Sequence, residues 1–323
     1  MTQKKNIYRA LLPAVLLLGM LAVSCTNKDL WWGGANAGVD RQKTAVVFEW
    51  TDAPAGYTPR GTMRTNLFSR TPEFASYGVS DLSAVNGGTM YLPVGASYNS
   101  VAYSYNADAK VYFRNENDSA NIEAYTSTMS RTTYTRAFPE ERTVASIADN
   151  VQFYVGWLSR FDVVKSEVPD TMVFVPHNVL HTCFFEVRGI TGAENITDSR
   201  GALSGMSPSY FLMRRELSST PVTLFFASSV EVQTGSIHGS FSTFGRLDTE
   251  NNFTIEILYP SATDGILQFT WDVTGQMIET DENGDYHILI DGSDIVVPNE
   301  GTGESGGGFD ADVNDWKEET ITF

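Results

Sequence analysis

The chain has 323 residues, of which 42% are hydrophobic, 12% aromatic and only 19% charged. This is a globular composition, with enough apolar side chains for one large core or two medium ones. The 22 Lys+Arg and 39 Asp+Glu give a formal charge of −17, so the basic surface that binds a phosphate backbone is absent and no nucleic-acid partner is expected. Two cysteines cannot form a disulfide scaffold, and no Cys-x-x-Cys pair indicates a zinc site.

The N-terminus has the layout of a bacterial export signal. Residues 1–9 carry three basic side chains and no acidic one, and residues 10–23 form an apolar run that is too short for a comfortable membrane span. The small residues that end this run before Cys25 resemble the cleavage box of bacterial lipoproteins, with Ala22 at a position where Leu or Val is commoner. We predict that residues 1–24 are a lipoprotein signal peptide.

Removal of this signal peptide makes Cys25 the first residue of the mature chain and the site of lipidation. Two or three acyl chains, at about 0.8 kcal/mol per buried methylene, hold a protein firmly at a membrane without a transmembrane helix. Residues 25–43 then form a lipidated tether rich in Gly, Asn and Asp. An ordinary signal peptide followed by an incidental cysteine is the alternative.

From residue 44 onward the sequence is typical of an antiparallel β-sandwich protein. Short β-rich runs are separated by Gly, Pro, Asn and Asp, and helical periodicity is nearly missing. Phe269, Trp271 and Val273 alternate as a strand with one buried face requires. The runs expected to form strands are 45–50, 62–68, 89–94, 98–105, 111–114, 122–126, 153–164, 172–175, 182–187, 223–227, 236–244, 253–258, 266–273 and 286–290. One short helix is expected within residues 140–149.

The chain turns polar near residues 168–170, between two apolar runs, and we place a domain boundary there. The predicted fold is all-β, with two tandem antiparallel β-sandwich domains at residues 44–169 and 170–298, each of a normal size for a sandwich. Residues 299–323 follow as a Gly-rich linker and a terminal strand. This strand must either fold back onto an edge of its own domain or add to the sheet of another molecule.

Motifs of reactive chemistry are almost missing from the sequence. His177 and His181 have a zinc-like spacing, but their surroundings predict a strand or loop, where the two rings do not converge as they would on a helix. Residues 281–285 resemble a calcium loop, but Gly and Glu do not stand where such a loop needs them. Cys183 lies in an apolar run and is expected to be a small buried side chain. No catalytic residue, metal ligand or cofactor is predicted.

A family resemblance is carried by six segments that together span nearly the whole mature chain. They are GALSGMSPSYFL at 201–212, HGSFSTFG at 238–245, WDVTGQ at 271–276, GGGFDADVNDW at 306–316, VFEW at 47–50 and GTMYLPVG at 88–95. On these segments the chain resembles a Bacteroidales lipoprotein family of undefined function within the fimbrillin superfamily. The segments are specific for family membership and carry no activity motif.

The resemblance implies two transthyretin-like β-sandwiches on a lipid-anchored, surface-exposed protein of the outer membrane. Such a protein is similar to the anchor and accessory subunits of type V fimbriae, in which a strand of one subunit completes the sheet of the next. The expected partners are the outer membrane, through lipid on Cys25, and pilin-like subunits, through strand addition. The terminal-strand residues expected to contact a partner are Trp316, Glu318, Thr320, Ile321 and Phe323.

The predicted function is therefore that of a non-enzymatic outer-membrane lipoprotein that anchors a fimbria-like surface assembly or forms an accessory part of it. The alternative is a cell-surface module that binds glycans or host ligands, using aromatic side chains such as Tyr103, Tyr105, Tyr125 and Tyr134. A hydrolase built on a pair of carboxylates is the third hypothesis.

The sequence also contains two Asp-Ser/Thr-apolar segments, at 118–120 and 170–172. They match the pattern used for O-glycosylation of exported proteins in the same bacterial group. Ser119 and Thr171 are the residues that would carry the sugar. Both are expected in loops, where a modifying enzyme has access.

Overall fold

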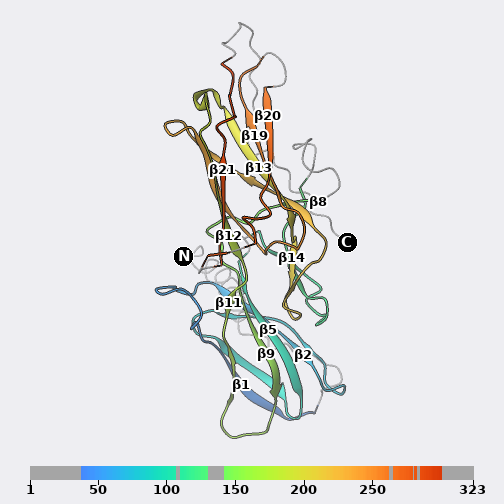
Figure 1. The fold of residues 1–323 in the computed structure, drawn as a ribbon. Coiled ribbons are helices and arrows are strands. Elements are labelled where there is room, and N and C mark those ends of the chain that lie inside the picture. Colours follow the sequence, from blue (N-terminus) through green and yellow to red (C-terminus); the bar gives the residue numbers. More distant parts are fainter. Residues whose placement is uncertain are drawn as a thin grey trace, which may run out of the picture. The chain divides into compact units, whose positions relative to one another are not determined.

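The computed structural model describes residues 38–106, 110–129, 142–261, 265–278, 280–281 and 284–299. Within these ranges the chain is built almost entirely of β-strands (Figure 1), with one 3-10 turn, η3 (Ala193–Asn195), and no α-helix. One compact unit begins at Arg41. The predicted all-β fold is confirmed.

In the first sandwich, a three-stranded sheet packs face to face against a five-stranded sheet. The three-stranded sheet has the order β10-β1-β4, formed by β10 (Asp170–Phe174), β1 (Arg41–Phe48) and β4 (Gly88–Pro93). The five-stranded sheet has the order β11-β9-β5-β2-β3, formed by β11 (His177–Asn178), β9 (Tyr154–Asp162), β5 (Ser97–Tyr105), β2 (Thr62–Ser69) and β3 (Tyr77–Ser83).

Alternating burial explains how these two sheets close on each other. In β1, the residues Gln42, Thr44, Val46 and Phe48 are buried at every second position, as a strand with one face on a core requires. The core between the sheets contains Val46, Phe48, Met90, Leu92, Met172 and Phe174 from the three-stranded sheet and Met63, Leu67, Tyr98 and Ala102 from the five-stranded sheet.

A smaller sheet covers the other face of the five-stranded sheet. It has the order β15-β14-β7-β6, formed by β15 (Glu216–Leu217), β14 (Ser209–Phe211), β7 (Glu123–Tyr125) and β6 (Tyr112–Arg114). The cluster between the two sheets includes Phe68, Val101, Tyr103 and Val155 of the large sheet, Ala124 of the small one, and Leu212, which directly follows β14. The inner strands β2 and β5 of the five-stranded sheet therefore pack against a core on both faces.

The second sandwich pairs a four-stranded sheet with a five-stranded one. The four-stranded sheet has the order β17-β18-β12-β21, formed by β17 (Ser229–Glu231), β18 (Ser236–Thr243), β12 (His181–Arg188) and β21 (Tyr286–Asp291). The five-stranded sheet has the order β20-β19-β13-β16-β8, formed by β20 (Ile266–Asp272), β19 (Asn252–Leu258), β13 (Asp198–Met206), β16 (Val222–Ala227) and β8 (Arg142–Ala145). Phe185, Phe226, Phe241 and Phe253 stand at the centre of the apolar core between them.

Most ladders are antiparallel, as predicted, but three are parallel. β1 pairs in parallel with β10, β12 with β21, and β8 with β16. Parallel neighbours cannot be joined by a tight hairpin. Each of these three pairs therefore brings together segments that lie far apart in the sequence.

The prediction of a helix within residues 140–149 is wrong for residues 142–149, which the structure describes. Residues 142–145 form β8 and pair along their length with β16. Val144 is fully buried in the core of the second sandwich. Tertiary packing has therefore overridden a weak local preference for helix.

The expected boundary at 169/170 does not coincide with the division of strands among the sheets. β10 and β11 follow that boundary but complete the two sheets of the first sandwich. β8 precedes it and is the last strand of a sheet in the second sandwich, and β7 pairs with β14. The chain thus crosses between the sandwiches more than once, and local composition does not reveal such crossings.

Candidate functional site

The sheet edges are the features of this fold that bear on strand addition. A strand paired on one side only leaves the backbone groups of its other side to water or to a new partner. Among the described strands, β10 and β4 end the three-stranded sheet, β17 and β21 end the four-stranded sheet, and β20 and β8 end the five-stranded sheet of the second sandwich.

The outer edge of β21 is closed by a side chain. The Gln276 amide donates through Nε2 to the Leu289 carbonyl oxygen at 3.2 Å, and its Oε1 accepts from the Leu289 backbone nitrogen at 2.7 Å. The side-chain amide thus makes the two hydrogen bonds that a neighbouring strand would make at this residue. Strand addition at this point of β21 must first displace Gln276.

The three-stranded sheet also has side chains that satisfy backbone groups. Arg41 donates from Nη1 to the carbonyl oxygen of Tyr91 in β4 at 3.0 Å. Gln42, which is buried, accepts from the Ser166 backbone nitrogen at 2.9 Å and donates to the Val168 carbonyl oxygen at 3.1 Å. The two Gln42 contacts fasten β1 to the connection between β9 and β10.

β20 is the longest edge strand of the second sandwich within the described residues. It pairs with β19 along seven residues without a register shift, from Asn252↔Asp272 to Leu258↔Ile266. Leu267, Phe269 and Trp271 pack on the core from this strand. A long, regular edge strand is the type of edge on which an added strand finds the most backbone partners.

The lipidation site and the terminal strand lie outside the described residues. Cys25 and the expected partner-strand residues Trp316, Glu318, Thr320, Ile321 and Phe323 all fall in segments that the structure does not describe. Both therefore remain predictions.

The two expected glycosylation residues occupy different environments. Ser119 is exposed in a turn, where the Asp118 carboxylate accepts from Asn121 Nδ2 at 2.7 Å and from the Ala120 backbone nitrogen at 2.9 Å. These hydrogen bonds, that of the Asn121 side chain first, lower the pKa of Asp118. Thr171 is exposed as well, but it lies within strand β10 rather than in a loop, because it pairs with Ala45 of β1.

The tyrosines expected to bind ligands are occupied by contacts within the protein. Tyr103 is fully buried and donates to Glu116 Oε1 at 2.5 Å, and its burial raises the pKa of its hydroxyl. The guanidinium carbon of Arg64 lies 3.8 Å from the ring centroid of Tyr105. Tyr125 has a similar contact with Arg114, and Tyr134 lies outside the described residues. The assignment of Tyr103 to a ligand-binding surface is wrong, because packing has enclosed it.

The two histidines with zinc-like spacing are held apart by different partners. His177 in β11 pairs through Nδ1 with Asp52 at 2.7 Å, and His181 in β12 contacts the Gly284 carbonyl oxygen through Nδ1 at 2.6 Å. No group of three or more His, Cys, Asp or Glu side chains that could hold a metal ion occurs in the described ranges. Cys183 is fully buried, which confirms its expected role, and burial raises the pKa of its thiol.

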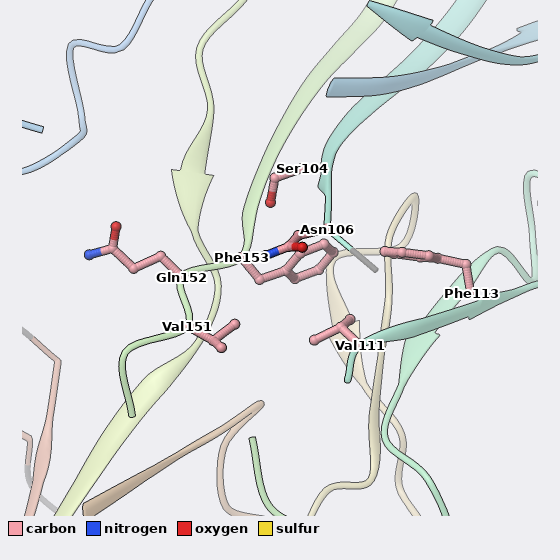
Figure 2. Close-up of a pocket in the computed structure, with 7 residues that line it drawn as sticks. All are labelled: Ser104, Asn106, Val111, Phe113, Val151, Gln152 and Phe153. Carbon is pink, nitrogen blue, oxygen red and sulfur yellow. The ribbon is translucent and has the colours of Figure 1, made fainter. Parts of the chain in front are cut away.

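A small cavity lies beside β5 and the connection that leads into β9 (Figure 2). Its volume is about 10 Å³, room for about one water molecule. Phe153, Val111 and Phe113 supply apolar walls, with Ser104 and Asn106 on the polar side. It is too small to be a ligand site.

The fold is similar to that of several solved structures. It is similar to a candidate adhesin from Bacteroides ovatus, with a TM-score of 0.58, 19% identity, and 83% of this chain and 97% of that chain covered. It is similar to the fimbrial anchor protein Mfa2 from Porphyromonas gingivalis, with a TM-score of 0.51, 11% identity, and 77% and 90% covered. It is also similar to a candidate polysaccharide-binding protein from Bacteroides thetaiotaomicron, with a TM-score of 0.51, 10% identity, and 79% and 93% covered. The chain thus shares its all-β fold with these solved structures.

The chain belongs to the family DUF5119, a domain of unknown function, whose match spans residues 24–227. No curated protein sequence matches it. In the part of the chain that the structure describes, no helix is long and apolar enough to cross a membrane.

Proposed function

We propose that this protein is a non-enzymatic outer-membrane lipoprotein that anchors a fimbria-like surface assembly, or forms an accessory part of it, through β-strand addition. The observation that carries the proposal is the fold, which the chain shares over most of its length with a fimbrial anchor protein and with a candidate adhesin. Lipid on Cys25 attaches the protein to the membrane, and the terminal strand around Ile321 engages a pilin-like subunit.

The proposed lipid anchor is supported by the sequence around Cys25. An apolar run of signal-peptide length ends two residues before Cys25. Acyl chains on Cys25 would bind the membrane, so the sandwiches themselves need no affinity for lipid. The expected tether of residues 25–43 ends earlier than predicted, because β1 begins at Arg41 and pairs with β4 from that residue on. Residues 25–40 therefore separate the acylated cysteine from the first strand.

Strand addition is supported by the open sheet edges. β20 offers seven consecutive residues on an edge with a strand partner on one side only, in the described part of the chain. Backbone hydrogen bonds would supply the affinity of an added strand, and its alternate side chains would set the register. The capped edge of β21 is the less accessible alternative, because Gln276 already occupies it.

Labelled palmitate and membrane fractionation test the anchor with a matched pair of cysteine variants. We expect the full chain and Cys183→Ala to incorporate palmitate and to sediment with outer membranes. Cys25→Ala is expected to lose both properties, since it removes the acylated sulfur while Cys183 is buried and distant from the signal sequence. A Cys25→Ala chain that remains in the outer membrane would overturn the proposed anchor.

A further inference from the structure

A second, larger recess lies where the five-stranded sheet of the first sandwich meets the turn between β14 and β15. Its volume is about 260 Å³, and it is lined by residues of β5, β9 and that turn and by Arg70, which directly follows β2. Pockets for drug-sized ligands measure about 300–1,000 Å³. This recess therefore suits a smaller ligand, about one sugar ring in size.

Two arginines at this recess contrast with the strongly acidic character of the chain. Arg70 and Arg215 both line it, on a protein with a formal charge of −17. Arg70 donates to Asn99 Oδ1 at 2.9 Å. The carboxylate of Asp162 interacts with Arg70, but it is already held by Arg160 at 2.8 Å. Within the described residues neither Arg70 nor Arg215 forms an ion pair within 4.0 Å.

Arg215 is held in place by an aromatic side chain. Its guanidinium carbon lies 4.5 Å from the ring centroid of Trp157. Trp157 is in turn fixed by a hydrogen bond from Nε1 to the Leu212 carbonyl oxygen at 2.5 Å and by stacking on His177. A guanidinium that stacks on a ring still presents its in-plane N–H groups, which suit the two oxygens of a carboxylate.

The backbone at Arg215 adopts a conformation that favours glycine. Its φ is 58°, in the left-handed region where glycine is favoured and another residue is strained. The turn would form more readily with glycine at this position, yet an arginine stands there and reaches the recess. Strain of this kind gathers at ligand-binding positions.

We propose that this recess binds one carboxylate-bearing sugar residue, of the uronic-acid or sialic-acid type, with Arg70 and Arg215 as the groups that hold the carboxylate. Asn99 and Ser159 supply neutral hydrogen-bonding groups for hydroxyls, and Met213 supplies apolar surface for the carbon face of the ring. An acidic peptide is less suited, because the recess is short and its remaining polar groups are neutral. The inference goes beyond the proposed assembly role and does not depend on it.

Calorimetric titration of the purified full chain with D-glucuronate, N-acetylneuraminate, D-glucose and acetate tests the proposal. We expect at least one acidic sugar to bind. Glucose and acetate should bind at least about tenfold more weakly, because glucose lacks the carboxylate and acetate lacks the sugar ring. Absence of binding by both acidic sugars would overturn the proposal. So would acetate or glucose binding as tightly as the acidic sugars.

A neighbouring arginine supplies the matched control. Arg215→Gly and Arg70→Gln should each weaken binding of the acidic sugar by about tenfold or more. Arg214→Ala changes the net charge equally, but Arg214 lies on Phe211 and beside Glu216 and does not line the recess, so it should keep wild-type affinity. Equal loss in Arg214→Ala would show a general charge effect and contradict the site. If the glycine variant does not fold, Arg215→Asn, which tolerates the same φ, gives the same test.

Discussion

The ring of Phe226 in β16 lies directly against the backbone of Gly201 in β13. A Cβ built on Gly201 would stand 1.9 Å from Phe226 Cε2, well inside the distance that real atoms adopt. Phe226 is itself buried and stacks on Phe241, with ring centroids 4.3 Å apart, so the ring has little freedom to move away. The glycine therefore makes room for an aromatic stack at the centre of the second sandwich.

Substitution of that glycine should destabilise the protein. Gly201→Ala is expected to lower the free energy of unfolding by about 1–3 kcal/mol, the usual effect of an overpacked core, as measured by denaturant unfolding. Gly275→Ala is the control, because a Cβ there meets nothing within 4 Å. Equal stability of Gly201→Ala and wild type would mean that the ring of Phe226 is not confined as described.

A buried ion pair should show an asymmetric response to mutation. Arg200 and Glu256 face each other across the β13–β19 ladder with Nε and Oε2 2.8 Å apart, and their side chains are 17% and 2% exposed. Arg200→Leu leaves a buried carboxylate without its partner and should cost about 3 kcal/mol in unfolding free energy. Arg200→Leu combined with Glu256→Leu should recover most of that loss. A double variant as unstable as the single one would argue against burial of the charge as the cause.

Removal of the side-chain cap on β21 should uncover an edge. Gln276→Ala deletes both hydrogen bonds to Leu289, so we expect a loss of about 1 kcal/mol in stability. The freed edge is exposed beside Leu289, and self-association at high protein concentration should increase in sedimentation experiments. Gln233→Ala, on an exposed turn, should change neither quantity. Unchanged sedimentation of Gln276→Ala would indicate that the cap does not guard this edge.

Acid should reduce the contribution of Asp162 to stability. The pKa of Asp162 is lowered by the nearby polar side chain of Ser97 and then by Arg160, whose Nε lies 2.8 Å from Asp162 Oδ2. A carboxylate with a lowered folded-state pKa stabilises the native state above its unfolded pKa and loses that contribution as the pH falls through the folded pKa. Wild type should therefore exceed Asp162→Asn in stability at about pH 7, and the difference should shrink in acid. A difference that grows on acidification has the wrong sign for this account.

Strands with bulky alternating side chains could be predicted from sequence, and strands made of small residues could not. The run 253–258 is predicted as a strand because Phe253, Ile255 and Ile257 alternate with other residues, and it lies within β19. β13, with the sequence DSRGALSGM, was not expected, although it pairs with both β16 and β19. Its small residues show no strand pattern in the sequence. The need for glycine at Gly201 depends on the ring of Phe226, which packs against it only in the folded chain.

The candidate sites also differ in whether the sequence alone can predict them. Cys25 could be proposed because its signal is local, a cysteine two residues after the end of an apolar run. The recess of Arg70 and Arg215 could not, because the two residues come from different strands and turns and meet only in the folded chain. The prediction that Tyr103 binds a ligand is wrong, because the sequence does not show that a small sheet covers this residue.

Recovery of pilin-like subunits with the full chain from solubilised outer membranes tests the central claim most directly. The account predicts that they co-purify with wild type and are lost when residues 317–323 are deleted. The truncated chain should keep its membrane attachment and its thermal midpoint. Subunits that remain bound after the deletion, or none that bind to wild type, would contradict strand addition, and a truncated chain that unfolds would show that the terminal strand folds back onto its own sandwich.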